Sequence, residues 1–170
     1  MASAEDYDRF IAPIEDRIIR CIWRIVRDQH DAQDALQNVL ARIWKCRGKV
    51  FGHANPTALI LRMCTNSAYD VLRQRLRTAP AARIPDVPGR EGQPLDAMVQ
   101  QEQKLQILHA ISQLSRKQAA AVLMRLVEQM PYSEIAAALE CSEVTARVHV
   151  QKGREQLRVR LGKLAPQIAR

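Results

Sequence analysis

The sequence predicts an all-α protein of two small helical domains joined by a flexible, proline-rich linker, with a helix-turn-helix in the C-terminal domain. Three observations support this prediction. Apolar residues recur every three or four positions through most of the 170-residue chain. Proline and glycine concentrate in residues 78–94. Near the C-terminus, two short helical patterns are separated by a polar turn. We therefore expect domains at residues 1–77 and 95–170.

Three helices are predicted for the first domain. Between Tyr7 and Arg27 the apolar residues form one stripe at helical spacing, so a single helix is expected there. A second helix is expected to begin near Asp31, whose carboxylate can cap free backbone amides, and to end by Gly48. A loop from Gly48 to Pro56 then leads to a third helix, Thr57–Arg77. The inward positions of this third helix are expected to be Ile60, Met63, Cys64, Ser67 and Val71.

The linker and the second domain follow from composition and periodicity. Residues 78–94 contain few large apolar side chains, so they cannot bury enough surface to offset the entropy of ordering. Helical periodicity resumes at Leu95 and breaks at Ser115. Beyond it, we expect a short helix at Tyr132–Leu139 and a long final helix capped by Ser142. The inner positions of the final helix are expected to be Ala146, Val150, Gly153, Leu157 and Leu161.

The distribution of charge favours a nucleic-acid partner. The net charge is +8, and the excess of basic residues lies in residues 48–80 and 141–170. Most of these residues are arginine, whose planar guanidinium suits phosphates and guanine edges. A solvated basic face is the alternative interpretation. No apolar run approaches the length needed to cross a bilayer, and the N-terminus lacks a secretory signal pattern. We therefore expect a cytoplasmic protein without membrane insertion.

The sequence does not favour an enzyme. It contains no phosphate-binding glycine loop, no recognisable pair of nucleophile and base, and no cluster of metal ligands. We therefore expect no catalytic residues, no metal and no cofactor. Four cysteines, Cys21, Cys46, Cys64 and Cys141, lie far apart within helical patterns. We interpret them as buried, reduced thiols rather than as a zinc site or a redox pair.

The segment from Tyr132 to Leu157 has the pattern of a helix-turn-helix, in which the second helix enters the major groove of DNA. A plain helical hairpin is the alternative, because such hairpins occur in any helical bundle. The outward positions of the second helix favour groove binding because they are basic or polar. These positions are Arg147, His149, Gln151, Lys152 and Arg154.

Three segments also resemble, in order, successive blocks of bacterial sigma factors of the small extracytoplasmic-function class. They are DAQDALQNVLARIW (Asp31–Trp44), ILRMCTNSAYDVLRQRLR (Ile60–Arg77) and LSRKQAAAVLMRLVEQMPYSEIAAALECSEVTARVHVQKGREQLRVRL (Leu114–Leu161). This resemblance implies a subunit that binds core RNA polymerase, directs it to promoter DNA through the −10 and −35 elements, and nucleates promoter melting. It also implies an anti-sigma factor as a regulatory partner.

The resemblance implies roles for individual residues. Polymerase docking falls to Asp31, Asp34, Gln37 and Arg42, although Asp31 and Asp34 also suit the N-terminus of their helix. For the −10 element, the resemblance implies that flipped bases are bound by Phe51, His53 and Asn55. It implies that phosphates and the upstream duplex are contacted by Arg62, Asn66, Arg73, Arg75 and Arg77. A packing or capping role is the alternative for Asn66. At the −35 element, base contacts fall to Arg147, Val148, Gln151 and Lys152, and phosphate contacts to His149 and Arg154.

Two other functions are compatible with the residues. One is a helix-turn-helix transcriptional regulator that binds duplex DNA without opening a promoter. The other is a degenerate interaction module that has lost promoter binding. Dependence on RNA polymerase distinguishes the first alternative, and loss of promoter binding by a folded chain distinguishes the second.

Overall fold

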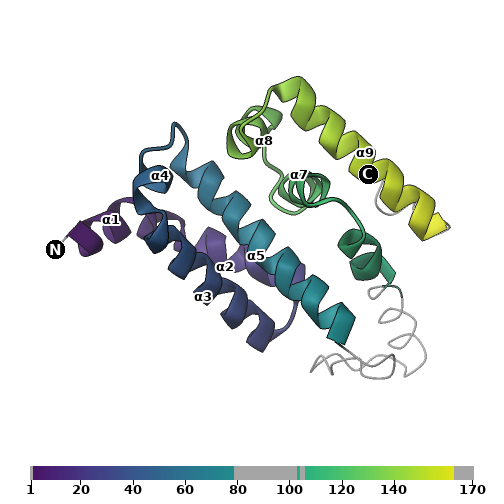
Figure 1. Cartoon of the computed structure of the whole chain (residues 1–170), viewed down its shortest axis with the longest axis horizontal. Coiled ribbons are helices and arrows are strands. Elements are labelled where there is room, and N and C mark those ends of the chain that lie inside the picture. Colours follow the sequence, from purple (N-terminus) through teal and green to yellow (C-terminus); the bar gives the residue numbers. More distant parts are fainter. Residues whose placement is uncertain (1, 79–102, 104–105, 163–170) are drawn as a thin grey trace.

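The computed structural model describes residues 2–78, 103 and 106–162, and these residues form helices and the turns between them (Figure 1). Within these ranges there is no strand, which confirms the prediction of an all-α protein. Residues 79–94 of the predicted linker, and residues 95–102, 104 and 105 of the helical pattern expected from Leu95, lie outside the described residues. The first domain consists of α1 (Ala2–Phe10), the 3₁₀ helix η1 (Ala12–Ile14), α2 (Glu15–Val26), α3 (Gln29–Lys45), α4 (Arg47–Phe51) and α5 (Pro56–Thr78).

The single helix expected between Tyr7 and Arg27 is divided into α1, η1 and α2, so that prediction was wrong. The break falls at Pro13, which lies in η1 and has no amide hydrogen to donate to an α-helix. Beyond the break, α2 ends where Arg27 adopts a left-handed conformation with φ of 55°. The expected apolar stripe is nevertheless buried along α2, at Ile18, Cys21, Ile22 and Ile25.

The boundaries of α3 and the segment after it also differ from expectation. Asp28, not Asp31, caps α3: its carboxylate accepts a hydrogen bond of 3.0 Å from the amide of Asp31. The segment expected to be a loop begins with the short helix α4. This helix forms because Val50 is buried in the core and Phe51 packs on the ring of Phe10. At the start of α5, the Asn55 side chain accepts a hydrogen bond from the amide of Ala58.

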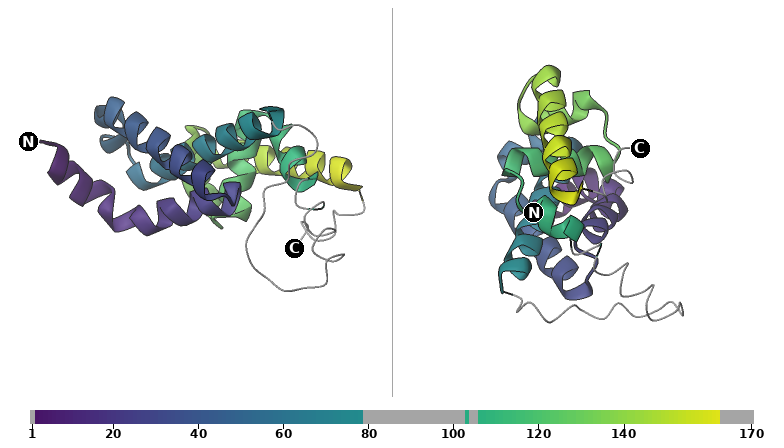
Figure 2. Two further views of the ribbon diagram at one scale, coloured as in Figure 1. Left: turned by 90° about the horizontal axis from the view of Figure 1, so that it is seen from below. Right: turned by 90° about the vertical axis from the view of Figure 1, so that its right-hand side faces the viewer.

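Helix α5 lies between the two domains (Figures 1 and 2). One side contacts α2 and α3, and the other contacts α7 and α8 of the second domain. Of the predicted inward positions, Ile60, Met63 and Cys64 are buried, while Ser67 and Val71 are half-buried. The prediction of one inward face was incomplete because α5 is covered on two sides. The additional buried residues include Leu59, Leu61, Ala68, Tyr69 and Leu72.

The second domain confirms most of its predicted pattern. It consists of a helix at 106–112, α7 (Arg116–Leu126), α8 (Tyr132–Leu139) and α9 (Glu143–Leu161). Ser115 and Gln118 form a reciprocal capping box at the start of α7. Ser142 caps α9 by accepting a hydrogen bond of 3.1 Å from the amide of Thr145. All five predicted inner positions of α9 are buried.

Gly153 lies where α9 crosses α7. A Cβ atom at this position would lie 2.5 Å from Cγ2 of Val122 and 3.5 Å from the carbonyl oxygen of Gln118. Glycine inside a helix is less favourable than alanine by about 1 kcal/mol. The close approach of the two helices explains why glycine is nevertheless suited to this position.

We predict that Gly153→Ala destabilises the protein although it improves helix propensity. Overpacking against Val122 costs about 1–3 kcal/mol and the propensity gain is about 1 kcal/mol, so the net loss is on the order of 1 kcal/mol. Urea unfolding followed by circular dichroism measures it. Val122→Ala should relieve the clash, so the double variant should lose less than the sum of the single variants.

Gly48→Ala is the matched control, because Gly48 is also helical and a Cβ atom there meets nothing within 4 Å. This control should be neutral or slightly stabilising. A Gly153→Ala variant that is more stable than the unaltered chain would contradict the explanation given for Gly153.

Candidate nucleic-acid interface

The outer face of α9 presents the side chains expected to contact the −35 element. Arg147, Val148, Gln151 and Lys152 are exposed, and His149 and Arg154 are half-buried. The four exposed residues lie on successive turns of one helix, whose opposite face is packed into the second domain. The structure therefore brings together all six residues that the sequence assigned to this interface.

The turn between α8 and α9 fixes how α9 projects from the domain. Glu140 adopts a left-handed conformation with φ of 54°. The amide of Cys141 donates a hydrogen bond to the carbonyl of Ala136, and the amide of Glu140 donates to that of Ala137. This pair of bonds is a Schellman motif, which ends α8 and reverses the chain. Ser142, two residues after Glu140, caps the start of α9.

Tyr132, at the start of α8, contacts the predicted base-contacting residue Arg147. The guanidinium carbon of Arg147 lies 4.4 Å from the centre of the Tyr132 ring, and that of Arg125 lies 4.9 Å from the same centre. Arg147 also donates a hydrogen bond of 3.4 Å to Glu143. Cation–π contacts of this kind contribute about 0.5–1 kcal/mol at exposed sites. Sequence reasoning missed Tyr132, because nothing in the pattern links it to a residue on the next helix.

The aromatic residue predicted for the −10 element, Phe51, belongs to a cluster. Its ring stacks on Phe10 with centroids 4.6 Å apart and planes at 8°, and it meets the edge of Trp44 at 6.3 Å. Phe51 is half-buried in this cluster. Phe10 and Trp44 were not predicted as site residues, although both are aromatic in a chain with few aromatic residues.

His53 and Asn55 lie together in the turn before α5. The amide of Asn55 donates a hydrogen bond of 3.0 Å to Nδ1 of His53. Asn55 also caps α5 through its side-chain oxygen. Both side chains are half-buried and lie near Phe51 in the sequence. Each accepts a hydrogen bond from a nearby backbone amide.

The polar residues expected to track DNA along α5 do not share one open surface. Arg73 and Arg77 are exposed, whereas Asn66 is half-buried. Arg62 donates a hydrogen bond of 2.6 Å to the carbonyl of Ala138 in the second domain. Arg75 points toward α3 instead.

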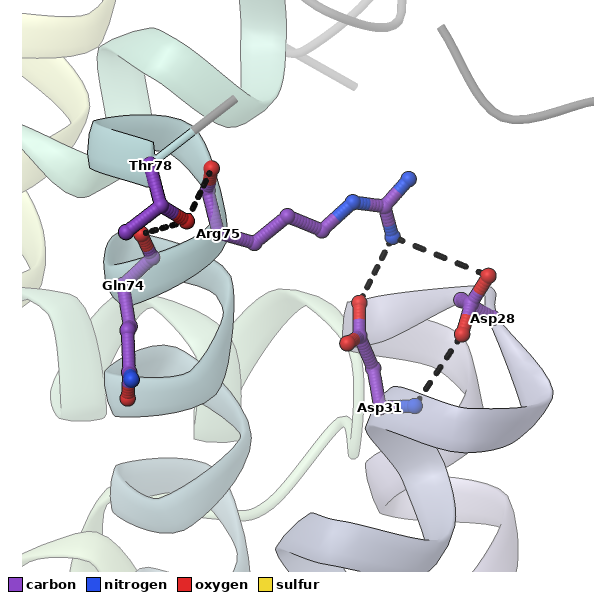
Figure 3. A network of polar contacts seen from close by, with 5 residues as sticks. All are labelled: Asp28, Asp31, Gln74, Arg75 and Thr78. Atoms are coloured by element: carbon purple, nitrogen blue, oxygen red, sulfur yellow. Dashed lines mark hydrogen bonds and ion pairs between the residues drawn. The ribbon is translucent and has the colours of Figure 1, made fainter. Parts of the chain in front are cut away.

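Arg75 and Asp31, which were predicted for different functions, are paired with each other (Figure 3). Nη1 of Arg75 lies 2.6 Å from Oδ2 of Asp31 and 4.0 Å from Oδ2 of Asp28. The pair spans a polar groove of about 500 Å³ between α3 and α5. Of the residues predicted to bind polymerase, Asp34, Gln37 and Arg42 are exposed on α3, and only Asp31 is held in this ion pair.

The cysteines differ in exposure. Cys21 and Cys64 are buried, Cys141 is half-buried and Cys46 is exposed, so the prediction of four buried thiols was wrong for Cys46 and only partly right for Cys141. Cys46 is exposed because it lies at the junction of α3 and α4. Burial raises the pKa of both the Cys21 and Cys64 thiols. The described residues contain no group of three or more side chains placed to hold a metal ion.

Comparison with known protein families agrees with this arrangement. Residues 10–78 match the family model "Sigma-70 region 2", and residues 104–157 match "Sigma-70, region 4". The chain is 30% identical over 155 residues to the RNA polymerase sigma factor CarQ of Myxococcus xanthus, covering 91% of this chain and 88% of that one. The chain belongs to the extracytoplasmic-function sigma factors of the sigma-70 family.

Two further relatives support this assignment. The RNA polymerase sigma-E factor of Streptomyces coelicolor is 28% identical over 162 residues, which cover 95% of this chain and 89% of the relative. The ECF RNA polymerase sigma factor SigE of Mycolicibacterium smegmatis is 28% identical over 173 residues, which cover 99% of this chain and 66% of the relative.

As a sigma factor, the protein confers promoter specificity on RNA polymerase, and its partners are core RNA polymerase and promoter DNA. Sigma factors as a family are non-catalytic regulators of transcription initiation. The presence of both region 2 and region 4 disfavours the alternative of a helix-turn-helix regulator without promoter opening. None of the helices in the described part of this sigma factor is long and apolar enough to cross a membrane.

We predict that a maleimide at neutral pH labels Cys46 of the native sigma factor quickly and leaves Cys21 and Cys64 unlabelled. The thiolate is the reactive form, so a raised pKa lowers the reactive fraction, and burial also blocks access. Mass spectrometry of peptides after timed labelling measures each rate. In denaturant all four thiols should react, and native labelling of Cys21 or Cys64 as fast as Cys46 would contradict the packing of α2 and α5.

Proposed function

We propose that the sigma factor divides promoter recognition between three surfaces. The outer face of α9 binds the −35 element, the exposed face of α3 docks on core RNA polymerase, and the segment from α4 into α5 reads and melts the −10 element. The observation that carries this proposal is the outer face of α9, where residues suited to DNA lie opposite a packed inner face.

At the −35 element, Arg147 and Lys152 donate hydrogen bonds to guanine edges, and Val148 contacts a thymine methyl group. Gln151 lies on the same face and pairs with adenine. His149 and Arg154 contact the phosphate backbone. Tyr132 supports this arrangement because its ring lies under the guanidinium of Arg147 and restricts its orientation before DNA arrives.

At the −10 element, unstacking a base step costs a few kcal/mol. Stacking of the base on side chains and hydrogen bonds to the base edge offset this cost. Phe51, with His53 and Asn55 beside it, receives the flipped bases. The stack of Phe10 on Phe51 supports the rigidity of this platform. Arg73 and Arg77 contact phosphates because they are the exposed arginines of α5. Arg62 joins them when its bond to Ala138 of the second domain is released, and the half-buried Asn66 contributes from the same helix.

The polymerase-docking surface is the exposed face of α3 containing Asp34, Gln37 and Arg42. Asp31 contributes indirectly, because its ion pair with Arg75 fixes the start of α3 against the end of α5. For the same reason, Arg75 is a structural residue in the free protein and reaches DNA only if this pair opens.

The protein acts in the cytoplasm, has no enzymatic activity of its own, and is regulated by an anti-sigma factor.

The test of this function is permanganate footprinting of thymines on supercoiled promoter fragments, with and without core RNA polymerase. Unpaired thymines that appear only when both proteins are present are expected. DNA that is bound but never opened would overturn the assignment of melting to Phe51 and its neighbours.

Two variants separate base recognition from phosphate contact. We predict that Lys152→Ala weakens binding to the preferred −35 duplex by about 1–3 kcal/mol and relaxes specificity at one base pair, whereas Arg77→Ala weakens binding to all sequences. Fluorescence anisotropy on a panel of duplexes with single base changes measures both. Arg160→Ala is the control, since Arg160 is exposed on the same helix but outside the proposed surface. Equal losses on every sequence for both variants would contradict the assignment.

A charge reversal tests the docking surface. We predict that Asp34→Lys weakens binding to core polymerase by about tenfold. The reversed charge disrupts the electrostatic complementarity between α3 and the polymerase surface. Binding is measured by displacement of a labelled sigma factor from the core enzyme. Asp16→Lys makes the same change at an exposed position of α2 and should have little effect. Similar losses for both variants would count against docking through α3.

A further inference from the structure

Helix α9 carries three exposed valines, and only Val148 has been assigned a contact so far. Val144 and Val159 are each 71% exposed, and Val148 is 39% exposed. Single exposed apolar residues are common on protein surfaces, so exposure alone indicates no function. The position of Val144 on the helix determines what this side chain can contact.

Val144 lies on the same face of α9 as residues that we propose to contact bases. It is the second residue of the helix, one turn before Val148, and Gln151 lies a further turn along. Residues three or four positions apart occupy one face of an α-helix. All three side chains are exposed, and α7 and α8 pack on the other side of α9 (Figure 1). Val144 therefore continues the proposed base-contacting surface to the first turn of the helix.

Packing within the second domain does not explain a valine at this position. The inner face of α9 is formed by other residues, including Ala146, Val150 and Leu157. Among the described residues, the hydrophobic core and the apolar side chains packed against it do not include Val144. Valine is also a poorer helix former than alanine, because its branched side chain loses rotamer freedom. The Val144 side chain is thus available to a partner.

The polar side chains around Val144 are already paired with one another. The Ser142 hydroxyl accepts a hydrogen bond of 3.1 Å from the amide of Thr145 and lies 2.9 Å from the Thr145 hydroxyl. Nη2 of Arg147 lies 3.4 Å from Oε2 of Glu143. The first turn of α9 therefore presents Val144 to a partner as an apolar contact.

An apolar contact at the start of a recognition helix selects one kind of base pair. The N-terminal residues of such a helix contact base edges in the major groove. Thymine is the only standard base that presents a methyl group there. Burial of one methyl group against valine improves affinity by about fourfold, because apolar surface leaves water.

The spacing of the two valines predicts the spacing of the thymines. Val144 and Val148 are four residues apart, which is about 6 Å along the helix axis at about 1.5 Å per residue. Base pairs follow one another about every 3.4 Å along the duplex. The two side chains therefore reach base pairs that are one or two steps apart.

We infer that Val144 is a further specificity-determining residue, which contacts a thymine methyl group in the −35 element. This thymine lies one or two base pairs from the thymine contacted by Val148. The inference rests on the proposed function, because it takes the outer face of α9 as the surface that binds the −35 element. The sigma factor thus selects promoters with two closely spaced thymines in this element.

A selection experiment tests the role of Val144. The holoenzyme, made from core RNA polymerase and the sigma factor, is bound to promoter fragments randomised across the −35 element, and the bound fragments are sequenced. The unaltered factor should prefer thymine at two positions that are one or two base pairs apart. Val144→Ala should lower the preference at one of them by about fourfold and leave the other positions unchanged. Val148→Ala should act at the other thymine.

Val159→Ala is the matched control, because Val159 has the same exposed fraction on the same helix. Val159 lies about 22 Å from Val144 along the helix axis, which exceeds the width of about 12 Å of the major groove. This variant should therefore keep every preference. Val144→Ala should fold normally, because the side chain is exposed and alanine is the better helix former, and circular dichroism checks this.

A second measurement tests contact with the methyl group itself. Deoxyuridine pairs like thymidine but lacks the methyl group, so replacing the selected thymidine removes only the proposed contact. The replacement should weaken binding of the unaltered holoenzyme by about fourfold, and it should not weaken binding of the Val144→Ala holoenzyme further. If the losses from the two changes multiply, Val144 does not contact this methyl group and the inference is overturned.

The outcomes distinguish this inference from the proposed function. If the unaltered factor shows preferences in the −35 element and Val144→Ala keeps all of them, the inference is wrong and the proposed function stands. If Val144→Ala weakens every preference equally, Val144 acts on the helix as a whole and the inference is also wrong. If the unaltered holoenzyme shows no preference across the −35 element, the function proposed for α9 fails, and the inference fails with it.

Discussion

The structure depends on the burial of α5 from two sides. On one side this helix completes the core of the first domain with α2 and α3, and on the other it receives α7 and α8. A helix in this position cannot be amphipathic in the usual sense, and buried residues occur around much of its circumference. Because α5 also carries Arg62, Arg73 and Arg77, the same helix links the stability of the first domain, the contact between the domains and the contacts proposed for DNA.

The second domain holds α9 in a fixed direction and leaves the outer face of this helix open. Gly153 lets α9 approach α7 closely, and the Schellman turn with the Ser142 cap sets the direction of α9. The inner face is then packed and the outer face keeps the side chains suited to DNA. The outer face of α9 is thus open, whereas α5 is partly covered by α7 and α8.

The sequence predicted those parts that depend on local patterns. The five inner positions of α9, its cap and the limits of α8 follow from periodicity and capping, and the structure agrees with all of them. The parts that were missed depend on distant contacts. The pair of Arg75 and Asp31 joins residues 44 positions apart, α4 relies on the stacking of Phe51 on Phe10, and the burial of Tyr69 depends on another domain. The division at Pro13 was visible in the sequence but was outweighed by a continuous apolar stripe.

Hydrogen–deuterium exchange in three states tests the central claim, that separate surfaces of the sigma factor bind core RNA polymerase and the two promoter elements. The states are the free protein, its complex with core RNA polymerase, and the promoter complex. The account predicts that α3 gains protection when the polymerase is added, and that α9 and the segment from α4 into α5 gain protection only when the promoter is present. If α9 gained no protection in a promoter complex that contained the −35 element, the account would be contradicted.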